Sequence, residues 1–279
     1  MISDEFEQHY NARLAVPDHA TWFDAWKTES AAARQALTGQ LDITYDNEEK
    51  GSLDFFPATQ KTGARPGLIF IHGGYWKAMD KSDYSWIARP WVQQGAHVLV
   101  INYMLCPKAT IGEIVKQVRR GYRWIVDHSA TLGLDPSRLT LVGHSAGAHL
   151  AAAILTDPQL PAPSAILGLS GIYDLTPLVQ TSMNQELKLD EPIARALSPL
   201  LSDRPKKSCR LHLYDGGLES LGFHDQTNRL AQAWGAEAYG QLAGLHHFSI
   251  LDPLKDEKSM LFQCCKRLIT TPPDHFLMA

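Results

Sequence analysis

The 279-residue sequence lacks the features of several common classes of protein. It has no excess of positive charge, because 26 Lys and Arg residues are outnumbered by 30 Asp and Glu residues and the net charge is −4. A slightly acidic chain has no overall electrostatic attraction for nucleic acid, so we expect no nucleic-acid partner. It also has no apolar run near the roughly 18–20 residues that a membrane-spanning helix needs, so we expect no membrane association.

Cysteines and metal-binding motifs are also scarce. The four cysteines are too few for a disulfide scaffold, and their spacing does not match a metal site. They are Cys106, Cys209, Cys264 and Cys265. Twelve histidines are present, but no H-x-H or H-E-x-x-H spacing occurs, so we predict no metal. The first residues carry acids where a signal peptide has bases, and no apolar segment follows, which favours a cytoplasmic protein.

The sequence does contain a regular alternation of short apolar runs and helical patterns. Hydrophobic residues make up 44% of the chain, which is enough for a large core. The apolar runs, typical of strands buried on both faces, are residues 67–71, 97–101, 139–142, 165–169 and, more weakly, 210–214. Between them, apolar residues recur at three- and four-residue spacing, as in the helix predicted around residues 114–126. This alternation predicts an α/β fold with a mostly parallel central sheet and helices on both faces.

Two segments lie outside this alternation. Residues 1–40 have a helical pattern, with Phe23 and Trp26 at helical spacing, and we interpret them as an N-terminal helical extension. Residues 175–208 have no clear strand and are rich in Pro, Ser and Leu, which predicts a small cap inserted over one end of the sheet. No break in composition divides the chain, so we predict a single domain over residues 1–279. We expect the extension and the cap to decide which substrate is accepted.

The most informative motif is the G-x-S-x-G sequence GHSAG at residues 143–147, which lies between the apolar run 139–142 and a helix-forming stretch. A nucleophilic serine has to sit on a sharp strand-to-helix turn that exposes its hydroxyl, and small neighbours let the backbone turn that tightly. Ser145 is therefore the predicted nucleophile. The following helix points its first amides at the same place, so the amide of Ala146 is a candidate oxyanion donor. The competing interpretation is an ordinary tight turn.

A second motif, HGGYW at residues 72–76, directly follows the first apolar run. Adjacent glycines let backbone amides approach a substrate oxygen without interference from a Cβ atom. The amides of Gly73, Gly74 and Tyr75 are therefore candidate donors to an oxyanion. The side chains of Tyr75 and Trp76 are candidate substrate contacts. The competing interpretation is a glycine hairpin beside two core aromatic residues.

A nucleophilic serine needs a general base, and the base needs a carboxylate to orient it. In hydrolases built on such a turn, the order along the chain is Ser, acid, His. Once histidines near the termini or inside strands are set aside, this order leaves His224, His246 and His247 after Ser145. His246 and His247 lie in a loop after a weak strand around residues 237–239, where the base belongs. The sequence pattern alone does not choose between them.

The acid should follow the apolar run 210–214. Asp215 lies at the end of that run, and Glu219 lies a few residues into the next loop. Asp225 already falls in the expected helix. Position along the chain therefore leaves Asp215 and Glu219 as the two candidates.

Taken together, the motifs HGGYW, GHSAGAHLAA and the late HHF resemble the arylformamidase (kynurenine formamidase) branch of the α/β-hydrolases. The resemblance runs over nearly the whole chain and includes residues 9–13, 53–57, 170–175 and 197–200. It implies an α/β-hydrolase fold and hydrolysis of N-formylkynurenine to kynurenine and formate, with no metal or cofactor. The alternative is a carboxylesterase or amidase of the same fold that acts on another small ester or amide. Both imply a small-molecule substrate, and a homodimer is compatible with the sequence.

The resemblance also selects among the catalytic candidates. In the family, the acid is followed by a phenylalanine and then by a glutamine in the next helix. Glu219, Phe223 and Gln226 fit this pattern, so the resemblance favours Glu219 over Asp215. Glutamate is a departure, because many relatives have aspartate here. The family base immediately precedes a phenylalanine, which selects His247. A non-catalytic binding protein is a third interpretation, disfavoured because every residue type of the triad is present.

Overall fold

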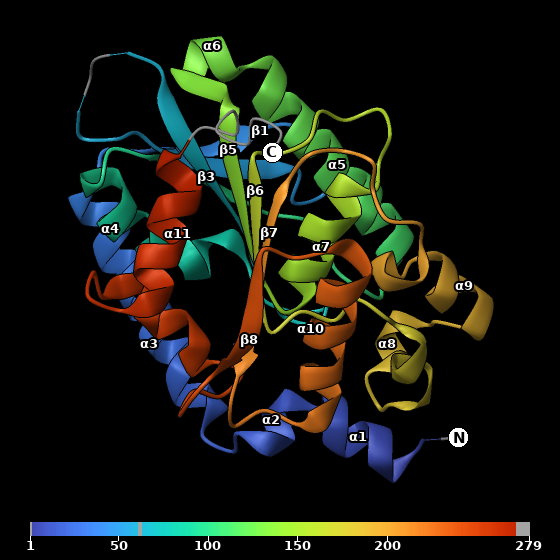
Figure 1. The fold of residues 1–279 in the computed structure, drawn as a ribbon. Coiled ribbons are helices and arrows are strands. Elements are labelled where there is room, and N and C mark those ends of the chain that lie inside the picture. The colour runs from blue at the N-terminus through green and yellow to red at the C-terminus, as the bar shows by residue number, and fades with distance from the viewer. Residues whose placement is uncertain (1, 61–62, 272–279) are drawn as a thin grey trace.

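The computed structural model describes residues 2–60 and 63–271. Within these ranges the strands form one eight-stranded sheet with the order β1-β2-β4-β3-β5-β6-β7-β8 (Figure 1). Their bounds are β1 Gln40–Thr44, β2 Ser52–Phe56, β3 Arg65–Ile71, β4 His97–Ile101, β5 Leu134–His144, β6 Ala165–Leu169, β7 Arg210–Gly216 and β8 Ala238–Leu242. The six strands β4, β3, β5, β6, β7 and β8 are parallel to one another, whereas β2 is antiparallel to both β1 and β4. The prediction of a mostly parallel sheet is confirmed.

Helices lie on both sides of this sheet, as predicted. On one side are α3 (His19–Ala36), α4 (Ala88–Gln93) and α11 (Met260–Thr270), and on the other are α5 (Ile111–Asp127), α7 (Ala146–Leu155) and α10 (Leu221–Trp234) (Figure 1). The remaining helices are α1 Asp4–Tyr10, α2 Ala12–Ala15, α6 Ser129–Leu132, α8 Asn184–Leu187, α9 Glu191–Ala196 and the 3-10 helices η1 Lys81–Ile87, η2 Thr176–Gln180, η3 Pro199–Leu201 and η4 Ser249–Lys255. No helix in the described ranges is both long and apolar enough to cross a membrane.

The register of the parallel strands brings their carboxyl ends to one edge of the sheet. Ile71 at the end of β3 lies opposite Gly143 of β5, and Leu169 at the end of β6 lies opposite Tyr214 of β7. The central parts of these strands are buried on both faces, and His72, Ser145 and Ser170 directly follow β3, β5 and β6. Loops that are far apart in the sequence therefore meet at this edge, which is the usual place for a ligand site in such sheets.

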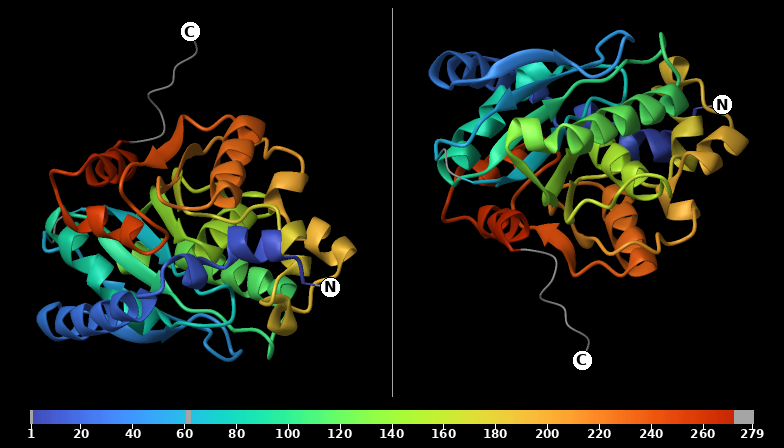
Figure 2. Two further views of the ribbon diagram at one scale, coloured as in Figure 1. Left: turned by 90° about the horizontal axis from the view of Figure 1, so that it is seen from below. Right: turned by 90° about the horizontal axis from the view of Figure 1, so that it is seen from above.

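The N-terminal helices pass over that same edge. In the view along the sheet from below, α1 and α2 lie across the carboxyl ends of the strands, and α3 continues along one side (Figure 2). The side chain of Asp54 on β2 anchors α3, because this fully buried carboxylate is paired with Arg34 of α3 and with Lys81 at 2.7 Å. We call residues 4–15, which form α1 and α2, the N-terminal cover.

The segment between β6 and β7 is a series of short helices. It contains η2, α8, α9 and η3, and it lies beside α10 at one end of the molecule (Figure 1). The side chain of Ser198 accepts a hydrogen bond of 2.7 Å from the amide of Leu175, which fixes the two ends of this excursion together. Lys77, next to the HGGYW motif, is paired with Glu186 of α8 at 2.8 Å.

Candidate active site

Ser145 lies at a sharp turn between β5 and α7. Its φ of 54° and ψ of −119° place a non-glycine residue in a strained region of backbone conformation. The two glycines of the motif permit this turn. A Cβ atom on Gly147 would lie 1.9 Å from the carbonyl oxygen of Ile71, and one on Gly143 would lie 2.4 Å from the carbonyl oxygen of Gly147. The pattern G-x-S-x-G is therefore required by close backbone contacts on both sides of the serine.

The side chains of His247 and Glu219 form a hydrogen-bonded pair beside this turn. The Nδ1 atom of His247 donates to Oε2 of Glu219 at 2.7 Å, and both side chains are almost completely buried. The other carboxylate oxygen, Oε1, accepts hydrogen bonds from the hydroxyl of Ser170 at 2.5 Å and from the amide of Gly216 at 2.6 Å. Since Nδ1 is held by the carboxylate, the Nε2 atom of His247 is left for proton transfer.

The other acid candidate, Asp215, is engaged elsewhere. Its fully buried carboxylate is paired with Nδ1 of His224 and accepts a hydrogen bond of 3.3 Å from the side chain of Gln241. Burial raises the pKa of this carboxyl group above its ordinary value. Asp215 and His224, the alternative acid and one alternative base left open by the sequence, are thus paired with each other in the structure.

The neighbouring histidine, His246, is also held in a structural role. Its Nδ1 atom accepts hydrogen bonds of 3.2 Å from the amides of Phe248 and Ser249, and its ring lies edge-on to Trp22 at 5.0 Å. Burial lowers the pKa of His246, which favours the neutral ring that this acceptor role requires. His247, and not His246, is therefore the histidine that faces the carboxylate.

The HGGYW loop packs directly against the serine turn. A Cβ atom on Gly73 would lie 3.2 Å from Cβ of Ser145, and Gly74 and Tyr75 have positive φ values of 108° and 52°. Within the described residues, the amides of Gly74 and Tyr75 donate to no protein acceptor. The amide of Ala146 is the first of α7 and so has no acceptor within its helix. These amides meet the requirement for an oxyanion site.

Two histidines of the motifs, His72 and His144, support the backbone of this arrangement. Burial lowers the pKa of His72 to about 4, and its Nδ1 atom lies 2.7 Å from the carbonyl oxygen of Gly73. Burial likewise lowers the pKa of His144 to about 3, and its Nε2 atom donates to the carbonyl oxygen of His247 at 2.7 Å. The residue preceding the serine thus fixes the backbone of the candidate base, a role that the motif alone does not reveal.

A small cavity joins Ser145 and His247. Its volume is about 20 Å³, which is close to the space that one water molecule requires. Besides these two residues, it is lined by Arg13, Phe23, Trp26, Gly74, Tyr75, Met79, Tyr84, His144 and Phe248. Three of these residues come from the N-terminal segment, and none comes from residues 175–208. The N-terminal segment, rather than the excursion after β6, thus forms the wall of this cavity, which we call the serine cavity.

Trp76 does not lie where the sequence suggested. Its side chain is fully buried and packs edge-on against His149 of α7, with the ring centres 5.0 Å apart. It is not among the residues that line the serine cavity. The positive φ of 54° at Trp76 turns its side chain away from that of Tyr75, which does reach the cavity. In the structure Trp76 thus lies outside the serine cavity, and its contact with a substrate stays a prediction.

Sequence reasoning missed most of the aromatic wall. Phe23 and Trp26 were recognised by their spacing as residues of a helix, but that spacing does not show what the helix packs against. In the structure, Phe23 lies edge-on to Phe248 at 5.2 Å, and Trp26 lies 5.3 Å from Tyr84. Only Phe248 could be placed near the site from the sequence, because it directly follows the candidate base His247.

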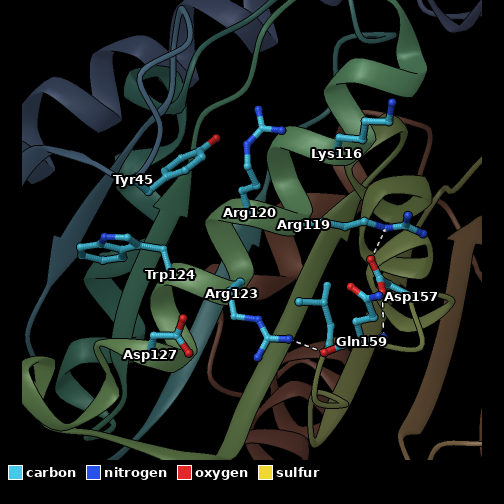
Figure 3. Close-up of a pocket in the computed structure, with 10 residues that line it drawn as sticks. Tyr45, Lys116, Arg119, Arg120, Arg123, Trp124, Asp127, Asp157 and Gln159 are labelled. Atoms are coloured by element: carbon cyan, nitrogen blue, oxygen red, sulfur yellow. Dashed lines mark hydrogen bonds and ion pairs between the residues drawn. The ribbon is translucent and has the colours of Figure 1, made fainter.

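A second, open groove of about 520 Å³ lies along α5, away from these residues. Figure 3 shows its basic side chains, among which Arg119 contacts Asp157 and Arg123 reaches the carbonyl oxygen of Gln159. Arg120 is paired with Asp46. Its lining contains no Ser, Cys or His side chain, so we assign the hydrolytic chemistry to the serine cavity.

Comparisons with known proteins agree with this geometry. The BD-FAE family model matches residues 53–198. A kynurenine formamidase of Danio rerio is 31% identical over 96% of this chain and 97% of its own length, and one of Salmo salar is 34% identical over 71% of this chain and 70% of its own. A solved structure from Silicibacter sp. TM1040, named for a proposed thioesterase activity, has a TM-score of 0.85 and 29% identity, and the match covers 96% of this chain and 100% of that one.

Proposed function

Because the chain belongs to the kynurenine formamidase family of α/β-hydrolases, we propose that it hydrolyses aryl formamides, such as N-formylkynurenine, to the free arylamine and formate. The observation that carries the proposal is the contact between Nδ1 of His247 and Glu219 in the wall of a cavity that also contains Ser145. These residues supply the base, the orienting carboxylate and the nucleophile of acyl transfer.

The proposed reaction has two halves. The Oγ atom of Ser145 attacks the formyl carbon while Nε2 of His247 takes the serine proton, and Glu219 stabilises the resulting imidazolium. The amides of Gly74, Tyr75 and Ala146, with that of Gly73, donate to the oxygen that becomes negative, an interaction whose loss typically costs about 10²–10³ in kcat per donor.

The tetrahedral intermediate then collapses. His247 gives its proton to the departing arylamine nitrogen as the carbon–nitrogen bond breaks, and a formyl ester of Ser145 remains. Water, deprotonated by His247, attacks this ester, and formate leaves as the serine is protonated again. Since serine, histidine and backbone amides suffice for both halves, we propose that the reaction needs no metal ion or cofactor.

The alternative activity uses the same residues. A carboxylesterase or amidase would differ in the acyl group that is transferred to Ser145 and in the alcohol or amine that departs as the acyl-enzyme forms, and one scaffold hosts many such substrates. We propose to compare kcat/KM for N-formylkynurenine with that for short p-nitrophenyl esters on the purified protein. A strong preference for esters with negligible formamide hydrolysis would contradict the formamidase proposal. Replacement of Ser145 by Ala is expected to abolish both activities, and residual turnover at wild-type level would refute the choice of nucleophile.

Two further expectations from the sequence stay predictions. A cytoplasmic location can be tested by fractionation of cells that express the natural chain. A homodimer can be tested by light scattering of the purified protein at several concentrations.

A further inference from the structure

Arg13 is the only cationic residue that lines the serine cavity in the described structure. It lies on α2 of the N-terminal cover, and its guanidinium carbon is 5.6 Å from the centre of the Phe23 ring. The residue is exposed, so it stands where the cavity meets the solvent. Within the described residues, no carboxylate lies within ion-pair distance of it. The other arginine of residues 1–40, Arg34, does not share this property, because it is paired with Asp54.

The rest of the cavity offers this cation no internal partner. Its wall is built from aromatic rings and Met79, and these groups carry no charge. The candidate triad acid, Glu219, already accepts hydrogen bonds from His247, Ser170 and the amide of Gly216. A guanidinium with no acidic partner at the entrance to an apolar cavity is suited to a negatively charged group on an incoming ligand.

The direction of substrate binding follows from the oxyanion site. The carbonyl group to be attacked has to lie between Ser145 and the amides of the HGGYW loop. The acyl side of a formamide is a single hydrogen atom, so the larger leaving group has to extend toward the aromatic wall. That wall comes largely from α3 and its neighbours, and Arg13 on α2 is the charged residue that borders it.

We propose that Arg13 is a specificity-determining residue that binds a carboxylate on the leaving-group side of the substrate. This inference rests on the proposed function and narrows it to aryl formamides that carry an acidic group, as an amino-acid substrate does. The planar guanidinium donates two parallel hydrogen bonds to the carboxylate, an arrangement that a lysine cannot reproduce. Since the cavity has room for about one water molecule, we expect its wall to open when a substrate enters, and the carboxylate then holds Arg13 beside the bound aryl group.

The test compares two substrates that differ only in charge, N-formylkynurenine and its carboxamide. In the Arg13→Gln variant, kcat/KM for the carboxylate substrate is expected to fall about 10- to 100-fold through KM, the size of a charge-assisted hydrogen-bonded pair. The value for the carboxamide should not change. Arg13→Lys should retain part of the activity that Arg13→Gln loses. Arg195→Gln is the matched control: it removes an exposed arginine of α9 outside the cavity and should leave kcat/KM for both substrates unchanged.

Equal effects on the two substrates, or no effect on either, would overturn the assignment of Arg13. A matched pair of aryl acetates, 4-acetoxybenzoate and 4-acetoxybenzamide, separates this result from a failure of the proposed function. If the wild-type protein hydrolyses the esters and not the formamides, the formamidase proposal is wrong, and the charge preference between the two esters still decides the role of Arg13. Loss of that preference at high ionic strength would support an ionic contact at an exposed site.

Discussion

Replacement of Glu219 by Gln tests the catalytic geometry most sharply, because it keeps the shape of the side chain and changes only its hydrogen-bonding atoms. Both carboxylate oxygens are acceptors in the structure: Oε2 accepts from His247, and Oε1 accepts from Ser170 and the amide of Gly216. A glutamine supplies one acceptor oxygen and one donor group. The amide of Gly216 cannot change into an acceptor, so the glutamine oxygen is expected to face it.

That orientation turns the NH₂ group of the glutamine toward Nδ1 of His247. The imidazole then has to accept at Nδ1 and carry its proton on Nε2, which is the wrong tautomer to remove a proton from Ser145. The same fault, loss of the correct tautomer with intact geometry, typically lowers kcat by about 10⁴-fold in a serine–histidine–acid triad. We therefore expect Glu219→Gln to lower kcat by about 10³- to 10⁴-fold while KM changes little.

The assay is steady-state hydrolysis of the best formamide or ester substrate, with circular dichroism and the thermal midpoint as checks of folding. Glu219→Asp keeps the charge and shortens the side chain by one methylene, so it should retain more activity than the glutamine variant. Asp215→Asn is the matched control, since Asp215 pairs with His224 and not with His247. A Glu219→Gln protein with kcat near wild type, or an Asp215→Asn protein with the larger loss, would refute the assignment of the acid.

Three other changes test the fold around the site. Gly147→Ala places a Cβ atom 1.9 Å from the carbonyl oxygen of Ile71, so it should cost about 1–3 kcal/mol or more in a urea unfolding titration, and an unchanged free energy would contradict the close contact. Asp54→Asn removes the buried carboxylate that pairs with both Lys81 and Arg34, and it leaves Lys81 with the exposed Asp42 at 2.6 Å; we expect a loss of about 3–5 kcal/mol by the same titration. Burial lowers the pKa values of three histidines, His72, His144 and His149, from the ordinary 6.5 to about 3 or 4. Between pH 4 and 6.5 the unfolded chain therefore binds more protons than the folded protein does. The free energy of unfolding should therefore fall as the pH is lowered from 6.5 toward 4, and a flat profile would contradict the buried neutral rings.

The strands and the serine turn could be predicted because their signals are local. A buried parallel strand is a continuous apolar run, and the turn at Ser145 needs glycines within two residues on either side. The order of residues along the chain narrows the candidate base to His224, His246 and His247, and their position relative to the last strand leaves the adjacent pair His246 and His247. These features depend on neighbours in the sequence, so a single sequence contains them.

The remaining features depend on contacts between distant segments. Asp215 and Glu219 both belong to the end of β7 and the loop after it. They differ in their partners, because Ser170 from the loop after β6 donates to Glu219, whereas His224 of α10 pairs with Asp215. The same limit applies to Trp76, which the local motif placed at the substrate but which the backbone turns toward α7. The aromatic wall was missed because α3 crosses the site from the other end of the chain. The spacing of apolar residues within α3 predicts a helix but does not show which distant residues that helix contacts.

The narrow serine cavity also has a kinetic consequence for bulky reagents and large substrates that react at Ser145. The serine is 1% exposed, and the cavity beside it has a volume of about 20 Å³, so we expect a bulky covalent reagent to reach the Oγ atom only in molecules whose cavity wall has opened. When such a reagent is in excess, the rate of inactivation stops rising with its concentration and becomes the opening rate itself. Turnover of any large substrate cannot exceed that rate, whatever the intrinsic speed of the chemical step.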